Sequence, residues 1–295
     1  MAAPTERLVL QSDWDQVLRE RNGKAWVIHK TSVPPSDYSE LHGHGLSSDG
    51  LLYITSKDEE FSVSNITKKS LMLSFNGEQG FISRKFVAPS ITFSTIHTHK
   101  KQVICLDTTP GGLGVSSDSE GKLKLWQTNT GEVRRNLEGH VGDVYTCRFF
   151  PSGIVVLSAG ADMMVKVWSA ETGECATTIT GHKAAVLDSD IIDRGRNVIT
   201  CSRDGTAKLW DVGQQACLGT FEEIGGGDVN ACSIGIPENS IDLGTPSIVK
   251  ICGTQEGYFY LLDLRNTSEP LLKWKESRGP VLSILPHKGG FFSST

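Results

Sequence analysis

Three tryptophans recur at one fixed interval in the middle of the chain. They are Trp126, Trp168 and Trp210, and 42 residues separate each from the next. A Gly-His dipeptide recurs in phase with them, at Gly139-His140 and at Gly181-His182. Self-similarity at a period of this length is the signature of a repeat architecture, in which each repeat is one supersecondary unit. The repeat therefore constrains the fold more than any other feature of the sequence.

Each repeat has the pattern of four short strands joined by tight turns. In the repeat that begins at residue 138, the strand-like runs are DVYTCRFF, IVVLSAG, MMVKVWS and ECATTIT, with turn residues such as Pro-Ser-Gly and Thr-Gly between them. A single four-stranded sheet cannot bury both of its faces, but sheets packed around an axis bury them against one another. We therefore expect an all-β propeller of four-stranded blades.

The pattern weakens outside the three regular repeats. About five blades and a fragment can be recognised, fewer than in most closed propellers, so whether the ring closes is left open. An exposed sheet edge is expected near Thr295. The predicted division is an N-terminal segment at 1–24, a degenerate blade at 25–80, blades at 95–137, 138–179 and 180–221, a divergent blade with an insertion at 225–272, and the start of a further blade at 278–295.

At its repeated positions the chain resembles the WD40 β-propeller family. In that family a His, a Ser or Thr, an Asp and the Trp indole form a buried hydrogen-bonded network within each blade. Such a network is chemically reasonable, because a buried indole N–H needs an acceptor and an imidazole can bridge a hydroxyl and a carboxylate. The resemblance implies two complete networks here, one of His140, Ser158, Asp162 and Trp168 and one of His182, Thr200, Asp204 and Trp210.

The first regular repeat departs from this pattern. It supplies Ser116 and Trp126, but Glu120 stands where the aspartate is expected. The candidate histidines, His97 and His99, lie one residue out of phase. Its network is therefore left open.

Composition and charge narrow the class of protein. The net charge is -5 and no Lys/Arg run exceeds two residues, so a general nucleic-acid binder is disfavoured. Seven cysteines without a CxxC pair favour thiols in a reducing compartment over a disulfide framework. The N-terminus lacks a signal core and no run approaches the ~20 apolar residues of a membrane span. We expect a cytoplasmic or nuclear protein that is monomeric outside complexes and binds neither nucleic acid nor membrane.

No catalytic arrangement stands outside the repeat framework. His140, His182, Asp162 and Asp204 are in phase with the tryptophans, so a structural role is favoured over acid–base chemistry. The HGHG run at 42–45 could hold a metal, but no Cys or carboxylate cluster accompanies it, so a surface loop is favoured. We expect no enzymatic activity, no cofactor and no metal site.

A closer resemblance covers most of the chain and includes residues outside the framework. The stretches APSITFSTIHT, LEGHVGDVYTCRFFPSG and DRGRNVITCSRDGTAKLWD resemble WD40 proteins that act on the proteasome. This resemblance implies binding to ATPase subunits of the 26S proteasome regulatory particle, and regulation of its assembly or of its association with the core particle. The alternative is a general WD40 interaction scaffold, such as a substrate adaptor of a ubiquitin ligase. Family geometry suggests Asp143, Tyr145, Leu187 and Arg203 as partner-binding residues on the loops.

Overall fold

The protein forms two compact units, Met1–Thr92 and Phe93–Thr295, called here the N-terminal unit and the propeller unit. We describe each unit by itself from a computed structural model. Apart from one short helix, the regular elements are strands paired in antiparallel sheets. The structure describes residues 7–30, 36–77, 80–89, 91–93, 96–97, 101–222, 227–235, 249–264, 270–275, 279–287 and 290–294.

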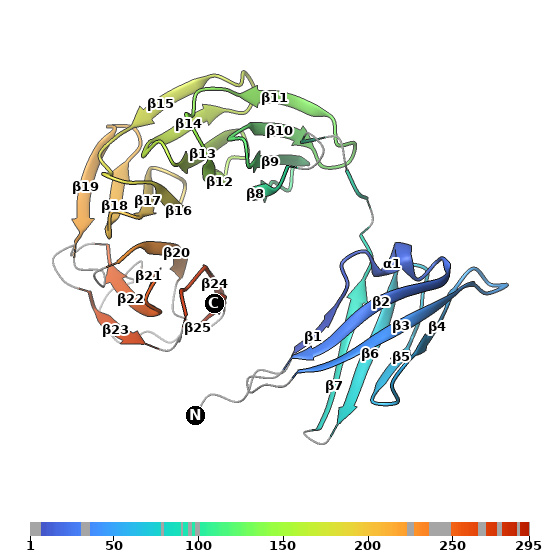
Figure 1. The fold of residues 1–295 in the computed structure, drawn as a ribbon. Coiled ribbons are helices and arrows are strands. Elements are labelled where there is room, and N and C mark those ends of the chain that lie inside the picture. Colours follow the sequence, from blue (N-terminus) through green and yellow to red (C-terminus); the bar gives the residue numbers. More distant parts are fainter. Residues whose placement is uncertain are drawn as a thin grey trace. The chain divides into compact units, whose positions relative to one another are not determined.

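The N-terminal unit consists of two sheets packed on each other. Inward residues alternate along its strands, as at Leu8 and Leu10 or at Ala25 and Val27, and both sheets contribute to one buried cluster. The short helix α1 (Trp14–Val17) lies at one end of the two sheets (Figure 1). The first sheet has β1 (Arg7–Leu10), β2 (Arg21–Lys30), β3 (Asp37–Leu46) and β4 (Leu52–Ser56), and the second has β5 (Phe61–Ser64), β6 (Ser70–Gly77) and β7 (Gly80–Val87).

This arrangement corrects the first two predicted segments. Residues 25–80 do not form one blade, because they supply strands to both sheets of the N-terminal unit. Of the predicted N-terminal segment at 1–24, the described residues 7–24 do not stand apart, since β1 pairs with β2 from Arg7↔Lys30 to Leu10↔Val27. The physical reason is that alternating apolar residues show which face of a strand is buried but not what covers it. Here the covering layer is a second sheet of the same unit.

The propeller unit contains four sheets of four strands each. Their strands lie within the predicted blades, except that the fourth sheet runs three residues beyond position 272. In chain order the sheets are β8 (Val103–Thr108), β9 (Leu113–Asp118), β10 (Leu123–Gln127) and β11 (Val133–Leu137); β12 (Val144–Phe149), β13 (Val155–Gly160), β14 (Val165–Ser169) and β15 (Cys175–Ile179); β16 (Val186–Ile192), β17 (Asn197–Ser202), β18 (Ala207–Asp211) and β19 (Ala216–Phe221); and β20 (Val229–Gly235), β21 (Val249–Thr254), β22 (Tyr258–Asp263) and β23 (Leu272–Lys275).

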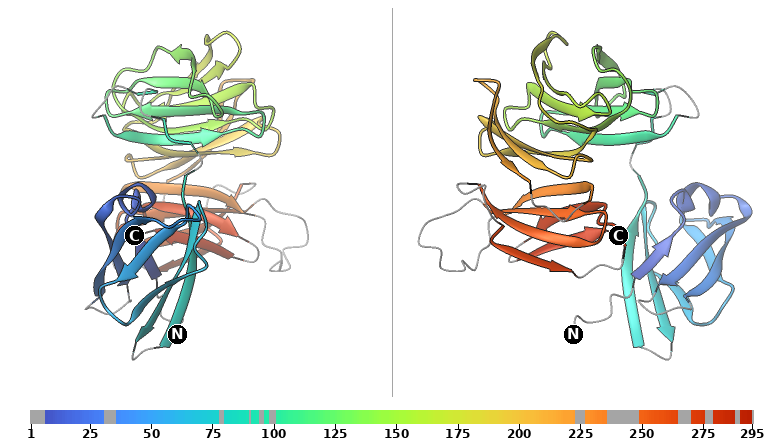
Figure 2. Two further views of the ribbon diagram at one scale, coloured as in Figure 1. Left: turned by 90° about the vertical axis from the view of Figure 1, so that its right-hand side faces the viewer. Right: turned by 60° about the vertical axis from the view of Figure 1, so that its left-hand side comes forward.

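These sheets are arranged like the blades of a propeller. The first strand of each sheet, β8, β12, β16 or β20, lies innermost and contacts the first strand of the next blade, while the fourth strand lies outermost (Figures 1 and 2). Apolar clusters fill the space between neighbouring blades; one of them, for example, joins Val115 and Leu125 of the first blade to Trp168 of the second. The core of the unit is therefore divided among the junctions between blades.

The end of the chain adds a two-stranded sheet of β24 (Ser283–His287) and β25 (Gly290–Ser294). Its first strand contacts β20 in the same way as the other inner strands contact one another. The described propeller unit thus has four blades and a hairpin. Five blades and a fragment were predicted, and the missing one is the degenerate blade at 25–80, which belongs to the N-terminal unit. Residues 236–248, within the divergent blade for which an insertion was predicted, and the predicted edge at Thr295 lie outside the described residues.

In the part of the chain that the structure describes, no helix combines the length and the apolar character that a membrane span requires.

Candidate functional site

The second blade contains the predicted four-residue network. The indole Nε1–H of Trp168 on β14 donates to Ser158 Oγ on β13 at 2.7 Å. His140 lies in the connection before the blade, with its Nε2 2.7 Å from Ser158 Oγ and its Nδ1 2.8 Å from Asp162 Oδ2. The aspartate is in the turn after β13 and also accepts from the Val141 N–H at 3.1 Å. The network therefore ties the turn to the connection between blades.

The third blade repeats this geometry. Trp210 Nε1 donates to Thr200 Oγ1 at 2.8 Å, and His182 Nε2 lies 2.7 Å from the same hydroxyl. His182 Nδ1 lies 2.8 Å from Asp204 Oδ2, which also accepts from the Lys183 N–H at 2.8 Å. Because the spacing of the four residues is the same in both repeats, the same chain path brings them together twice.

Burial sets the protonation of these networks. Burial lowers the pKa of His140 and of His182 more than the neighbouring aspartates raise it, so both imidazoles are neutral near pH 7. Burial raises the pKa of Asp204, but hydrogen bonds from Thr206, Lys183 and His182 outweigh it and hold that pKa at about 2. The neutral imidazole then donates from Nδ1 to the aspartate and accepts at Nε2 from the hydroxyl.

The first blade completes its network with a residue that the repeat pattern does not indicate. His97 Nε2 lies 2.6 Å from Ser116 Oγ, which accepts from Trp126 Nε1 at 3.0 Å. The partner of His97 Nδ1 is Asp118, whose Oδ2 is 3.0 Å away. Glu120, at the expected position, instead pairs with lysines at the surface. A carboxylate at the end of β9, two residues after the serine, was the available signal.

The network histidines and aspartates lie in or next to the loops at one end of the blades. We call this the loop end; it consists of the connections at 138–143 and 180–185 and the turns at 119–122, 161–164 and 203–206. His140 and His182 are each held by an aspartate of a turn, so the loops of the second and third blades are fixed by hydrogen bonds from buried groups. Such loops on a rigid framework are where binding residues are commonly found.

The four predicted partner-binding residues all lie at this end. Asp143 immediately precedes β12, and its carbonyl accepts from the Ala161 N–H at 2.8 Å. Tyr145 and Leu187 are the second residues of β12 and β16, and both are half-buried. Arg203 follows β17 and is exposed. These placements leave their binding role a prediction.

Arg203 already has a partner within the chain. Its Nε lies 3.3 Å from Asp228 Oδ2, and the two side chains are 55% and 35% exposed. Asp228 stands just before β20, so the ion pair joins the turn of the third blade to the start of the fourth. An exposed pair of this kind contributes little to stability, and its guanidinium remains accessible.

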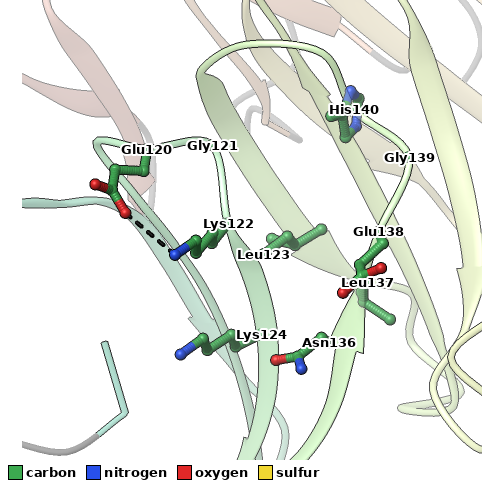
Figure 3. Close-up of a pocket in the computed structure, with 10 residues that line it drawn as sticks. All are labelled: Glu120, Gly121, Lys122, Leu123, Lys124, Asn136, Leu137, Glu138, Gly139 and His140. Carbon is green, nitrogen blue, oxygen red and sulfur yellow. Dashed lines mark ion pairs between the residues drawn. The ribbon is translucent and has the colours of Figure 1, made fainter. Parts of the chain in front are cut away.

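A pocket of about 440 Å³ lies between the turn of the first blade and the connection to the second (Figure 3). Its charged side chains are largely engaged with the protein itself. Glu120 pairs with Lys101 at 2.7 Å and with Lys122 at 3.2 Å, and Lys124 Nζ donates to the Ile96 carbonyl at 2.7 Å. The lining carries both signs of charge, from Glu120 and Glu138 and from Lys122 and Lys124, so it does not favour a ligand of one sign.

Charged residues of the inner strands were missed by the sequence analysis. Arg148 Nε on β12 donates to the Ser189 carbonyl of β16 at 2.6 Å, and Arg148 Nη2 lies 3.5 Å from Asp188 Oδ1. Burial lowers the pKa of Arg148, but the charges of neighbouring groups, chiefly Asp188 and Asp190, together raise it by more than burial lowers it, so the guanidinium stays charged. The signal was a charged residue within an otherwise apolar strand, and its partner could not be identified from one blade alone.

The HGHG run is not the surface loop that was expected. It belongs to β3, where His42 Nε2 lies 3.4 Å from Glu40 Oε2 and His44 Nε2 lies 2.8 Å from Thr55 Oγ1 on β4. Gly43 lies against the backbone of Leu18, where a Cβ atom would not fit, whereas a Cβ atom at Gly45 would meet only Arg21 Cγ at 3.8 Å. Among the described residues, no group of three His, Cys, Asp or Glu side chains is arranged to hold a metal ion.

The comparison with protein families places two repeats in this unit. The family model of the WD domain, G-beta repeat, matches residues 131–169 and 173–211. Each match runs from the outer strand of one blade through the first three strands of the next. The sequence repeat is thus one strand out of phase with the blade, and neighbouring blades are linked because each repeat contributes to two of them.

Curated relatives match the whole chain or part of it. It is 45% identical to the human protein named Proteasomal ATPase-associated factor 1, in an alignment of 347 positions that covers all of this chain and 86% of the relative. The chicken protein of the same name is 44% identical, with 97% and 85% covered. A protein of Dictyostelium discoideum, named Probable proteasomal ATPase-associated factor 1, is 28% identical over 150 positions, which cover 50% of this chain and 34% of the relative. The chain therefore belongs to the proteasomal ATPase-associated factor 1 family of non-enzymatic WD40 proteins.

Proposed function

We propose that this protein binds an ATPase subunit of the proteasome regulatory particle through the loop end of its propeller unit. The observation that carries the proposal is the 45% identity, over the whole chain, to a relative named for its association with proteasomal ATPases. The framework residues are occupied by the buried networks, so binding falls to the loop residues. Asp143, Tyr145, Leu187 and Arg203 are the proposed contacts.

Binding of this kind would act by steric control of assembly. A propeller on the face of an ATPase subunit covers surface that neighbouring subunits or the core particle need, and it leaves when they compete for that surface. The net charge of -5 favours a partner with a basic patch, because complementary charge speeds association and aids discrimination. We further propose that the protein acts in the cytoplasm or the nucleus as a monomer outside complexes, without nucleic acid or membrane.

The first test is capture of purified regulatory-particle ATPase subunits, each presented separately to the full chain. We expect selective capture of one or two subunits. Trp210→Ala serves as the unfolded control, because truncation of a buried tryptophan costs ~3–5 kcal/mol. If the wild-type chain, folded and β-rich, captured none of the subunits, the proposed partner would be wrong.

Arg203→Glu tests the site. We expect at least about a tenfold loss of affinity for the captured subunit, equivalent to ~1.4 kcal/mol, because an exposed arginine at a contact is a frequent anchor. Arg134→Glu is the matched control: it makes the same charge change on the outer strand β11, near the opposite end of its blade. Titration calorimetry or biolayer interferometry measures both.

A third variant separates binding from the internal ion pair. Asp228→Ala breaks the pair with Arg203 but keeps the guanidinium. If Arg203 contacts the partner, Asp228→Ala retains affinity and Arg203→Glu does not. Equal losses in the two variants would show instead that the ion pair only positions the loops.

A further inference from the structure

Two cysteines face each other across the junction of the first two blades. Cys105 on β8 and Cys147 on β12 are 42 residues apart, and their Sγ atoms are 2.9 Å apart. A disulfide bond is ~2.05 Å long, so the sulfurs are within about 1 Å of bonding distance. The two strands are the innermost strands of neighbouring blades (Figure 1). The two cysteines therefore face each other between two sheets that are not joined by backbone hydrogen bonds between strands.

Hydrogen bonds between side chains of the first blade and the backbone of β12 lie on either side of the two thiols. Asp107 Oδ2, two residues along β8, accepts from the Phe149 N–H of β12 at 2.7 Å. Ser117 Oγ of the first blade donates to the Val144 carbonyl at the start of β12 at 2.7 Å. The strands are thus held together on both sides of the thiols, which keeps the two cysteine backbones close to each other.

The two thiols have different environments. Cys105 is half-buried, whereas Cys147 is buried. The hydrogen bond between the two thiols lowers the pKa of Cys105, burial opposes this, and Ser117 and the Arg148 charge assist, so that the pKa of Cys105 lies below its usual value. The contact with Cys105 and burial both raise the pKa of Cys147. A more acidic, half-buried thiol beside a buried second thiol is the arrangement of a redox-sensitive cysteine and its resolving partner.

We propose that Cys105 and Cys147 form a redox modification site, at which hydrogen peroxide converts the two thiols into a disulfide between the inner strands of the first two blades. The Cys105 thiolate attacks the peroxide oxygen, the O–O bond breaks, and the released hydroxide takes up a proton to leave as water. Cys147 then attacks the resulting sulfenic sulfur; the S–S bond forms, the S–O bond breaks, and a second water leaves. Two thiols supply the two electrons that reduce one hydrogen peroxide.

The remaining cysteines provide internal comparisons. Cys201 and Cys252 have Sγ atoms 3.7 Å apart, but both are fully buried, and burial raises the pKa of Cys201. Cys175 and Cys217 are exposed on outer strands, and each lies near a threonine hydroxyl of its own strand. Only the Cys105–Cys147 pair, among the described residues, combines a short sulfur–sulfur distance with partial exposure.

The cross-link should stabilise the propeller unit. It closes the chain between residues 105 and 147, which restricts the unfolded state. The oxidised protein should therefore unfold several degrees above the reduced protein in a thermal melt. The effect is independent of any partner, so it neither requires nor tests ATPase binding.

The test uses the full chain with Cys175→Ser and Cys217→Ser, which removes the two exposed thiols. The protein is treated with hydrogen peroxide, alkylated after denaturation, digested and analysed by mass spectrometry. We expect a linked peptide pair containing Cys105 and Cys147, two hydrogens lighter than the thiols, together with a higher melting temperature. Dithiothreitol should reverse both changes.

Two results would overturn the proposal. One is full alkylation of both cysteines after peroxide treatment; the other is oxidation of Cys105 to sulfinic acid while Cys147 is still alkylated. Cys105→Ser, which keeps the size of the side chain, should melt like the reduced parent and show no peroxide-induced rise. If that variant folds poorly, the reduced and oxidised forms of the parent supply the same comparison.

Discussion

At the scale of residues, a few buried polar atoms join segments that are far apart in the chain. The aspartate of each network accepts from a histidine of the preceding connection and from N–H groups of its own turn, as Asp118 does with His97, Glu120 and Lys122. Burial raises the pKa of Asp118, but these donors outweigh it, so the pKa is lowered and the side chain stays ionised. A residue can therefore complete the network if its carboxylate oxygens reach the histidine, even when it does not stand at the usual position of the repeat.

Asp118→Ala tests this account of the first blade. The change leaves a buried imidazole N–H and two backbone N–H groups without their acceptor, so we expect a loss of about 1–3 kcal/mol in the free energy of unfolding. Urea denaturation followed by tryptophan fluorescence measures it. Glu120→Ala is the matched control and should change little, because its carboxylate pairs with lysines at the surface. A larger loss for Glu120→Ala than for Asp118→Ala would contradict the assignment.

At the scale of elements, the innermost strand of each blade has backbone N–H groups on its free edge that need hydrogen-bond acceptors. Each pairs with the second strand of its own blade on one edge only, so N–H groups on the other edge need acceptors. Aspartates of the preceding blade supply them: Asp188 Oδ2 accepts from the Cys232 N–H at 2.9 Å, and Asp190 Oδ2 accepts from the Ile234 N–H at 2.8 Å. The blades are therefore joined by polar bridges as well as by apolar clusters.

Asp190→Ala should weaken the junction between the third and fourth blades. We expect about 1–3 kcal/mol of lost stability, since the Ile234 N–H loses its acceptor in a packed junction. Hydrogen exchange should show faster exchange at Ile234 than in the parent. Glu171→Ala, at an exposed turn residue, removes the same charge and should leave both readouts unchanged. Unaltered protection at Ile234 in Asp190→Ala would show that the bridge is dispensable.

At the scale of the whole molecule, the chain is two units with separate cores. The N-terminal unit pairs its strands internally and buries Leu41, Leu71 and Leu73 completely. The propeller unit spreads its apolar clusters over successive junctions, so each blade depends on its neighbours. The alignment with the human relative spans 347 positions against 295 residues here, so that relative contains internal residues without a counterpart in this chain.

The N-terminal unit should fold by itself. We expect residues 1–92, expressed alone, to give a β-rich circular dichroism spectrum and a cooperative urea transition, because its core is closed within the unit. Trp14, which is buried there, reports the transition by fluorescence. By contrast, residues 93–179, which contain two blades, should not unfold cooperatively. An unfolded 1–92 fragment would mean that its stability depends on the rest of the chain.

The sequence by itself determined the β class, the blade period and most members of the networks. Trp168 and Trp210, with their histidines, hydroxyls and aspartates, could be predicted because an equal spacing along equal strands returns each side chain to the same place in every blade. The four predicted partner-binding residues could be placed at one end of the blades for the same reason, although their role remains a prediction.

Only the tertiary structure decided the rest. Asp118 was missed because a carboxylate can reach the same point from a position two residues earlier in the chain. The N-terminal unit was taken for a blade because a two-residue alternation shows which face is buried and is the same whatever covers that face. The bridges from Asp107 and Asp190, and the approach of Cys105 to Cys147, join residues more than 40 positions apart. Such contacts depend on how sheets pack in space, and no local pattern in the sequence records that packing.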